Sequence, residues 1–291
     1  MNVSSISVII PTYNSANTIA KCIESIRSQS PFVPKEIIVV DGGSNDGTVD
    51  IVSSLGVKKI VVTKKNRSRQ RNEGAYRTSS SWLLFIDSDM TLKSDVISAC
   101  NEVIESAPNS IVAAVVPEIS VGGTFWAKSR AFERSFYEGI WWIEAARLVR
   151  RDEFLTVKGY DEFLGEVGGE DGDLDTRLRQ EGDITRVSGT LIYHNETNMS
   201  FKKLYSKKRK YSPTLSTSFK ARNSLRSQRQ LRLVPRLQVF LRKPLKIIRH
   251  PILFLGVMII GCIEYTVLIQ HRLVHRKNSM QVSEPHFPGP K

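Results

Sequence analysis

"LLFIDSDM", residues 83–90, joins four apolar residues directly to a pair of aspartates, Asp87 and Asp89, which Ser88 separates. A short apolar run of this kind predicts a buried strand. Carboxylates are rarely buried without a partner, so their place at the end of the run needs an explanation. In parallel sheets that helices cover on both faces, ligands bind at the carboxyl ends of the strands. We therefore expect the two aspartates to face a ligand at one edge of such a sheet.

Strand and helix patterns alternate along the first 200 residues. Short apolar, β-branched runs predict strands, and apolar residues at helical spacing, such as Ile19, Ile23 and Ile26, predict amphipathic helices. This alternation predicts an α/β fold, with a mostly parallel sheet and helices on both of its faces. The expected strands are residues 5–10, 36–41, 58–63, 82–87, 111–116 and 190–196, and the expected helices are residues 15–29, 49–55 and 168–182.

Basic residues are concentrated at the C-terminal end of this chain of 291 residues. Residues 1–200 hold 22 Lys and Arg against 27 Asp and Glu, whereas residues 201–291 hold 20 against 2. We therefore divide the chain into a globular domain, residues 1–200, a basic amphipathic segment, residues 201–250, and a hydrophobic helix with a short tail, residues 251–291. The basic segment indicates contact with a polyanion, either nucleic acid or an anionic membrane surface.

The hydrophobic stretch of residues 252–269, "ILFLGVMIIGCIEYTVLI", contains one charged residue, Glu264. A membrane-spanning helix needs about 20 predominantly apolar residues, so a single-pass helix and an interfacial helix both stay open, with a buried core helix as a third alternative. The basic residues before this stretch favour a cell-membrane location with the globular domain on the cytoplasmic side. An N-terminus without a signal-peptide pattern and three scattered cysteines, Cys22, Cys100 and Cys262, agree with that side.

The aspartate pair is the first of three candidate sites. Asp87 and Asp89 lie two positions apart, so their side chains share one face of a strand. Two carboxylates at one point suit Mg²⁺ or Mn²⁺, which bind a few protein carboxylates together with substrate phosphates. A solvated strand end or a helix N-cap explains the same residues without a metal. His194, near the end of the last expected strand, is by itself more often structural than a metal ligand.

Two glycine-rich segments are the other candidate sites. In "VVDGGSNDGT", residues 39–48, Asp41 ends a strand and glycines allow a ligand to approach the backbone, although an ordinary turn explains the same residues. In "GGEDGDLDTRL", residues 168–178, Glu170 and Asp171 follow two glycines, as a general base on a flexible loop would. An acidic helix start is the alternative for this second segment.

Taken in order, these segments resemble the inverting family-2 glycosyltransferases of GT-A fold, of the membrane-associated type that acts on polyprenol- or dolichol-linked sugars. The resemblance covers roughly residues 5–200. The segments that carry it are "SVIIPTYNSANTIAKCIESIRSQ", "EIIVVDGGSNDGT", "RNEGAYRTSSSWLLFIDSDM" and "LVRRDEFLTVKGYDEFLGEVGGEDGDLDTRLRQEG". It implies a GT-A, Rossmann-like fold for the globular domain, followed by C-terminal amphipathic or membrane helices.

The resemblance also implies roles for individual residues. Asp41 would contact the nucleotide base or ribose, and Asp89 would be the more direct metal ligand, with Asp87 and His194 as further ligands. Asp171 would be the catalytic base beside Glu170, and either Arg147 or Arg150 would approach the acceptor. The residues that would line the nucleotide pocket are Pro11, Thr12, Tyr13, Asn14, Asp41, Arg71, Asn72, Asp87, Ser88 and Asp89.

The implied activity is the transfer of a sugar, with inversion and a divalent metal, from a UDP- or GDP-linked donor. The C-terminal composition indicates a lipid-linked acceptor at an anionic membrane surface. One alternative is a polyprenyl-phosphate sugar synthase, whose anionic acceptor hardly needs a base, and another is transfer to a growing polysaccharide. A non-enzymatic binder of nucleic acid or membrane is disfavoured. The acidic first 200 residues offer no basic groove and no zinc-finger or RRM motif occurs, so we expect no nucleic-acid partner.

Overall fold

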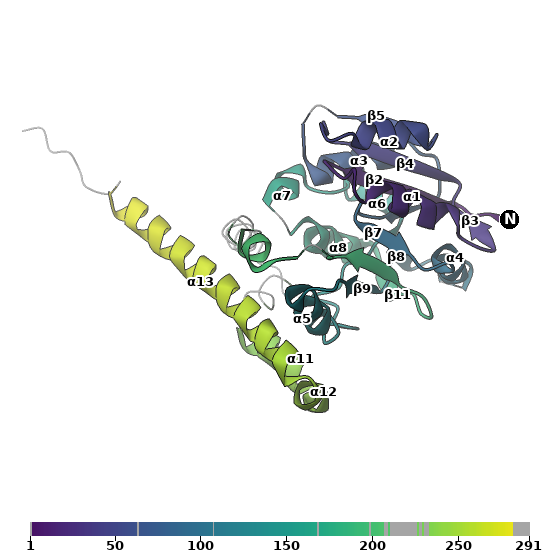
Figure 1. The fold of residues 1–291 in the computed structure, drawn as a ribbon. Coiled ribbons are helices and arrows are strands. Elements are labelled where there is room, and N and C mark those ends of the chain that lie inside the picture. The colour runs from purple at the N-terminus through teal and green to yellow at the C-terminus, as the bar shows by residue number, and fades with distance from the viewer. Residues whose placement is uncertain are drawn as a thin grey trace, which may run out of the picture.

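The centre of the molecule is a seven-stranded sheet (Figure 1). The structure, a computed structural model, describes residues 2–62, 64–106, 108–167, 169–197, 199–206 and 233–281, together with residues 209, 226 and 229. The order of the strands across the sheet is β11-β8-β10-β6-β2-β4-β5. Their bounds in that order are Asp183–Arg186, Ile111–Val115, Leu148–Arg150, Trp82–Phe85, Ile6–Thr12, Glu36–Asp41 and Lys58–Val61.

All strands of this sheet run parallel except β10, which is antiparallel to both β6 and β8. The parallel register pairs Thr12 with Asp41, so β2 and β4 end level with each other. Because β10 is reversed, its first residues lie at the edge where β6 and β8 end, and the Phe85 amide donates to the Arg147 carbonyl at 3.0 Å. One edge of the sheet therefore collects the loops after β2, β4, β6 and β8, as the sequence predicts.

Helices cover both faces of the sheet, and each face has its own apolar core. Val8 and Ile10 of β2 pack with the helix α1 on one face, while Ile9 between them packs on the other face with Phe154 of α6. This alternation confirms the predicted α/β layering. The helices of this part of the chain are α1 (Ile19–Arg27), α2 (Thr48–Ser54), α3 (Arg67–Tyr76), α4 (Val96–Ser106), α6 (Arg151–Thr156), α7 (Glu162–Val167) and α8 (Glu170–Glu181).

The helix α3 was not expected, because its sequence, "RSRQRNEGAY", lacks apolar residues at helical spacing. Its first turn is capped instead, since the Asn66 side chain accepts a hydrogen bond from the Arg69 amide at 2.9 Å. Gly74 lets this helix close on the sheet: a Cβ at Gly74 would lie 2.4 Å from Cγ2 of Ile9. A polar helix thus lies directly against β2.

The predicted strand at residues 190–196 exists as β12 (Ile192–Asn195), but it lies outside the main sheet. It is the middle strand of a small sheet, between β7 (Met90–Leu92) and β9 (Glu118–Val121). There β12 runs antiparallel to β7 and parallel to β9. The Asn195 amide donates to the Asp89 carbonyl at 2.9 Å, so this sheet brings His194 beside the aspartate pair. Two short strands, β1 (Asn2–Val3) and β3 (Phe32–Val33), pair elsewhere.

The C-terminal helices form a third apolar core against α5 (Phe125–Arg134). They are α11 (Leu233–Leu241), α12 (Pro244–Arg249) and α13 (Pro251–Gln281), and α13 extends away from the sheet (Figure 1). Pro244 begins α12, whereas Pro235 lies in the first turn of α11 and does not break it, since a proline there sacrifices no helical hydrogen bond. Of the predicted basic segment, residues 207–208, 210–225, 227–228 and 230–232 lie outside the described residues.

Within the part of the chain that the structure describes, no helix is both long and apolar enough to cross a membrane. Residues 252–269, for which the sequence left a single-pass, an interfacial and a buried helix open, lie within α13. Glu264, the one charged residue of that stretch, pairs with Arg236 of α11 at 3.3 Å.

Candidate active site

Side-chain hydrogen bonds tie together the loops at the carboxyl ends of β2, β4 and β6. The Asn14 side chain accepts from the Asn45 amide at 3.0 Å, and the Ser15 amide donates to the Thr48 hydroxyl at 2.8 Å. The hydroxyls of Ser15 and Ser88 lie 2.8 Å apart. The loop after β2, the glycine-rich turn of residues 39–48 and the segment of the aspartate pair thus form one surface.

Four residues that were predicted to line the nucleotide pocket differ in how far they are buried at this surface. Pro11 and Thr12 are buried in β2, whereas Tyr13 is half-buried, with the Lys65 ammonium 3.7 Å from the centre of its ring. Asp41 is almost fully buried, and its carboxylate accepts hydrogen bonds from the amides of Gly43 and Ser44 at 2.8 Å. In this structure Asp41 therefore shapes its own loop.

Asn72 departs from its predicted role. Its side chain is buried and bonds both ways to the backbone of Tyr160, donating to the carbonyl at 2.9 Å and accepting from the amide at 2.8 Å. The Tyr160 ring in turn lies 4.9 Å from the Arg71 guanidinium. Asn72 thus positions the ring that lies beside Arg71.

Arg71 is the centre of the site. Its side chain is 1% exposed, and its guanidinium pairs with Asp87 at 2.7 Å and with Asp171 at 2.9 Å. Burial opposes protonation of Arg71, but Asp171 and Asp87 outweigh it and hold the pKa well above its usual range. One cation therefore joins the end of β6 to the start of α8.

Glu170 lies on the inner side of this network. Its side chain is 1% exposed and pairs with Arg67 at 2.5 Å, while Arg71 lies 3.6 Å away. Burial and the neighbouring Asp171 raise the pKa of Glu170. Asp171, by contrast, has a side chain that is 37% exposed, so of the two predicted catalytic carboxylates it is the one that can meet a substrate.

Asp87 is held by arginines from two sides. Its second oxygen lies 3.5 Å from Arg147, whose guanidinium also pairs closely with Glu118. Burial disfavours the charged form of Asp87, but Arg71 and Arg147 outweigh it and hold its pKa far below the usual range. In this structure both oxygens of the carboxylate thus face arginines.

Asp89 and His194 face each other, with the Nε2 atom of His194 3.2 Å from the Asp89 carboxylate. On the other side of the ring, Nδ1 lies 3.2 Å from Arg134 and 3.8 Å from Glu118. Burial lowers the pKa of His194, but hydrogen bonds to Asp89 and Glu118 outweigh it and raise the pKa. Asp89 itself is 46% exposed, so the pair opens towards solvent.

Two of the three predicted metal ligands therefore converge. Among the described residues, no group of three or more His, Cys, Asp or Glu side chains could hold a metal ion. A carboxylate and an imidazole nevertheless fit Mg²⁺ or Mn²⁺ bound together with substrate phosphates, because such ions often take only one or two protein ligands and keep water and phosphate as the others. Asp89 and His194 meet that requirement, whereas Asp87 pairs with Arg71 and Arg147 in this structure.

A cavity of about 260 Å³ lies beside Asp171, at the end of β8 and the start of β10. It is on the opposite side of β6 from the loops of β2 and β4. Its charged lining residues are Glu118, Arg130, Arg134, Glu144, Arg147 and Asp171, three of each sign. The site thus has two sides, with Asp87 and Asp89 between them.

The sequence reasoning missed Arg67, Glu118 and Arg134, which no motif marks. Of the two arginines considered for the acceptor side, Arg147 lines the cavity. Arg150 lies elsewhere, since its guanidinium stacks 5.2 Å from the ring of Trp82 and pairs with Glu153 at 3.6 Å. Arg67 lies four positions before Arg71, on the same face of α3. That spacing could have indicated Arg67 as a second arginine beside the predicted carboxylates.

Comparison with known proteins matches residues 7–160 to the family described as Glycosyl transferase family 2. The chain is 28% identical over 196 residues to the succinoglycan biosynthesis protein ExoA of Rhizobium meliloti, a match that covers 60% of the chain and 58% of ExoA. It is 36% identical over 91 residues to the glycosyltransferase AglE of Haloferax volcanii, covering 29% of the chain and 30% of AglE. The matches thus span less than two thirds of these relatives.

Solved structures share the fold at low sequence identity. The mannosyltransferase PcManGT of Pyrobaculum calidifontis, in complex with GDP-Man and Mn²⁺, aligns with a TM-score of 0.59 at 15% identity, covering 89% of the chain and 75% of PcManGT. Residues 1–349 of TarS of S. aureus, in complex with UDP-GlcNAc, align with a TM-score of 0.56 at 17% identity, covering 74% of the chain and 66% of TarS. These similarities confirm the predicted α/β fold of GT-A type.

The ion pairs of Arg71 with carboxylates at the site predict that Arg71→Met strongly destabilises the fold. The substitution leaves three neighbouring carboxylates without their shared cation, so we expect a loss of about 3–5 kcal/mol in the free energy of unfolding at pH 7, measured by urea denaturation. The depressed pKa of Asp87 contributes stability above the unfolded value of about 4, and this contribution is lost as the pH falls towards the folded value. The difference between variant and wild type should therefore shrink below pH ~4.

Arg69→Met is the matched control, because Arg69 lies on the same helix and pairs with Glu162 at 3.6 Å while both side chains are about half exposed. We expect this control to lose no more than about 1 kcal/mol. Equal losses in the two variants would contradict the central role of Arg71.

Proposed function

Because the chain belongs to glycosyl transferase family 2, we propose that it transfers a sugar, with inversion, from a nucleotide-diphosphate donor to a hydroxyl group of a lipid-linked acceptor. The observation that carries this proposal is the position of Asp171, whose half-open carboxylate is oriented by Arg71 and lines a cavity next to the aspartate pair. A general base needs this combination of fixed geometry and access to the substrate.

The donor would lie over the loops of β2 and β4. Tyr13 and the backbone around Gly43 offer a ring face and an open approach for a base and ribose, at the edge where parallel sheets bind ligands. PcManGT and TarS are described in complex with GDP-Man and UDP-GlcNAc, which supports a UDP- or GDP-linked donor here. The diphosphate would then reach Asp89.

Asp89 and His194 would hold Mg²⁺ or Mn²⁺ together with the diphosphate. The metal would neutralise the negative charge that develops on the diphosphate as it leaves. Mn²⁺ in the PcManGT complex supports this cofactor. Asp87 would contribute indirectly, since it fixes Arg71 and Arg147 on either side of the aspartate pair.

Asp171 would accept the proton of the attacking hydroxyl. An inverting displacement requires the acceptor on the face of the sugar opposite the leaving group. The cavity beside Asp171 lies across β6 from the proposed nucleotide side, which is the arrangement such an attack needs. Glu170 would act as a positioning residue, because it is buried against Arg67.

The charge of the cavity favours a hydroxyl acceptor over a phosphate acceptor. Glu118 pairs with Arg147 and lies 3.5 Å from Arg134, while Arg130 pairs with Glu133 at 2.5 Å. Neutralised arginines offer hydrogen bonds to a sugar but little net attraction to a phosphate. The polyprenyl-phosphate synthase therefore stays the second candidate, which the Asp171 test below separates from the first.

A membrane surface is the proposed location of the acceptor. Around α12, apolar side chains that are 59–72% exposed alternate with cations, and we call this surface the C-terminal patch. Anionic lipid would attract its cations and the bilayer interface would bury its apolar side chains, with the catalytic domain on the cytoplasmic side. The patch consists of Leu241, Arg242, Lys243, Leu245, Lys246, Ile248, Arg249, Ile252 and Leu255.

The proposal is tested first with Asp171→Asn. Purified protein is incubated with a panel of UDP- and GDP-sugars, Mn²⁺ or Mg²⁺ and membrane lipid extract, and the product is identified by mass spectrometry. We expect the variant to bind the donor normally and to lose about 10²–10⁴-fold in transfer rate, because only the base is removed. Glu181→Gln, at the exposed end of the same helix, should keep wild-type activity. Near-normal transfer by Asp171→Asn would favour the phosphate acceptor.

Asp89→Ala tests the metal site. Calorimetric titration with UDP and with GDP, in the presence and absence of Mn²⁺, should show metal-enhanced binding in the wild type and none in the variant. The control is Asp95→Ala, which removes an exposed carboxylate that pairs with Lys93. Metal enhancement that survives in Asp89→Ala would exclude this residue as a ligand.

The C-terminal patch is tested by flotation with vesicles that contain phosphatidylglycerol, after nuclease treatment. The double variant Leu245→Ser and Ile248→Ser should bind at least about tenfold less, since each exposed apolar side chain contributes about 1.5 kcal/mol or more when buried. Val61→Ser, which removes a 55% exposed side chain on β5, should bind like the wild type. Co-purification with nucleic acid and no flotation would support the nucleic-acid alternative.

A further inference from the structure

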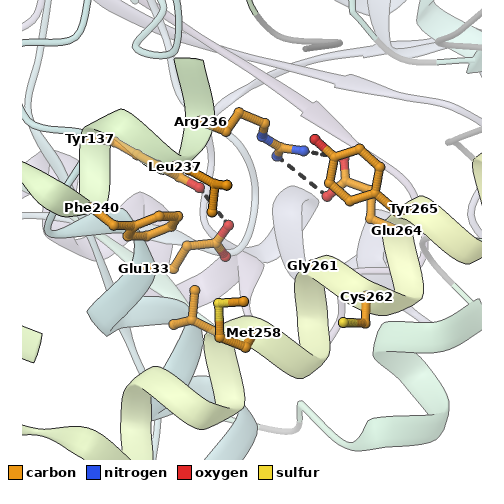
Figure 2. Close-up of a pocket in the computed structure, with 11 residues that line it drawn as sticks. Glu133, Tyr137, Arg236, Leu237, Phe240, Met258, Gly261, Cys262, Glu264 and Tyr265 are labelled. Atoms are coloured by element: carbon orange, nitrogen blue, oxygen red, sulfur yellow. Dashed lines mark hydrogen bonds and ion pairs between the residues drawn. The ribbon is translucent and has the colours of Figure 1, made fainter. Parts of the chain in front are cut away.

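A second cavity, of about 330 Å³, lies between α5, α11 and α13 (Figure 2). Most of its wall is hydrocarbon, from Leu237, Phe240, Val257 and Met258, and Gly261 leaves room on the α13 side. Leu237 and Met258 are 37% and 39% exposed, so the wall reaches the surface of the molecule. This cavity is separate from the edge of the sheet where the donor would bind.

Each charged residue of this cavity has a partner of opposite charge. Arg236 pairs with Glu264 at 3.3 Å (Figure 2), and Glu133, which also accepts a hydrogen bond from the Tyr137 hydroxyl at 2.6 Å, pairs with Arg130 of the Asp171 cavity at 2.5 Å. Burial of Arg236 opposes its protonation, but Glu264 outweighs it and raises its pKa. A ligand in this cavity therefore meets apolar surface and no net charge, which suits a hydrocarbon and disfavours a free anion.

The apolar cavity adjoins the cavity of Asp171. Tyr137 lines both, and Arg130, in the wall of the Asp171 cavity, pairs with Glu133 in the wall of the apolar one at 2.5 Å. A molecule that occupied both would need a polar end beside Asp171 and an apolar end among the C-terminal helices. The C-terminal patch adjoins the apolar cavity, because Leu241 follows Phe240 on α11.

We propose that the apolar cavity binds the hydrocarbon chain of the lipid acceptor while the hydroxyl of its polar head lies beside Asp171. This inference rests on the proposed function. A volume of about 330 Å³ is in the range of small-molecule pockets, and a partner helix would need an extended groove. The adjoining C-terminal patch would meet the bilayer that supplies the chain.

Gly261→Phe tests the inference by filling the cavity. An added Cβ at Gly261 has no heavy atom within 4 Å, so the new side chain can enter open space without moving the backbone. Gly261→Ala is the matched control, since a methyl group leaves most of the volume. Met258→Trp fills the cavity from another position, so that misfolding of one variant, detected by thermal unfolding, does not decide the result.

The first measurement uses a long-chain alkyl glucoside with a diazirine in its chain, presented in phosphatidylcholine vesicles. After irradiation, the wild type and Gly261→Ala should be labelled on α11 and α13 at cavity residues such as Phe240. Labelling should fall at least tenfold in Gly261→Phe and Met258→Trp. Undiminished labelling in both filled variants, or labelling confined to Leu245 and Ile248, would overturn the inference.

The second measurement separates this inference from the proposed function. In transfer assays with membrane lipid extract, the filled variants should show about a tenfold higher KM for the extract and unchanged calorimetric binding of the nucleotide. Unchanged KM with normal transfer would overturn the chain site and leave the proposed function standing. Cavity labelling in a wild-type protein that binds nucleotide and transfers no sugar would overturn the acceptor role of the chain.

Discussion

The buried guanidinium of Arg71 is the constraint on which the site depends. A cation with 1% exposure is tolerable only when carboxylates surround it, and Asp87, Asp171 and Glu170 provide them from two distant parts of the chain. Removing any one of these acids would leave charge unbalanced in a nearly dry environment. The same contacts that stabilise the fold therefore fix the distance between the aspartate pair and the proposed base.

This arrangement explains why neighbouring carboxylates differ in function. Asp87 and Glu170 are turned inward, each beside an arginine, and serve to orient their neighbours. Asp89 and Asp171 are the more exposed member of each pair, at 46% and 37%, and lie where the donor and the acceptor are proposed to bind. Each motif thus combines one structural carboxylate with one that is available for chemistry.

The sequence predicted the parts of the site that depend on local pattern. Apolar runs that end in polar residues mark strand ends, and parallel strands bring such ends to one edge, which is why Asp41 and Asp87 were located in advance. It could not show that Asp87 pairs with arginines, nor that Asn72 supports Tyr160, because those contacts depend on how α3 packs. The polar α3 itself has no apolar period to reveal it.

The C-terminal helices also make contacts that the sequence does not predict. Residues 252–269 are apolar enough to suggest a membrane, but their sequence does not reveal that Glu264 has a partner on α11 or that Gly261 opens a cavity. With the charge of Glu264 neutralised by Arg236, α13 can pack on α5 and still present apolar side chains near the surface. A charge-balanced cavity at Asp171 and an adjoining hydrocarbon-lined cavity, which share Tyr137 in their walls, would together suit one amphiphilic molecule, whereas a soluble sugar would occupy only the first.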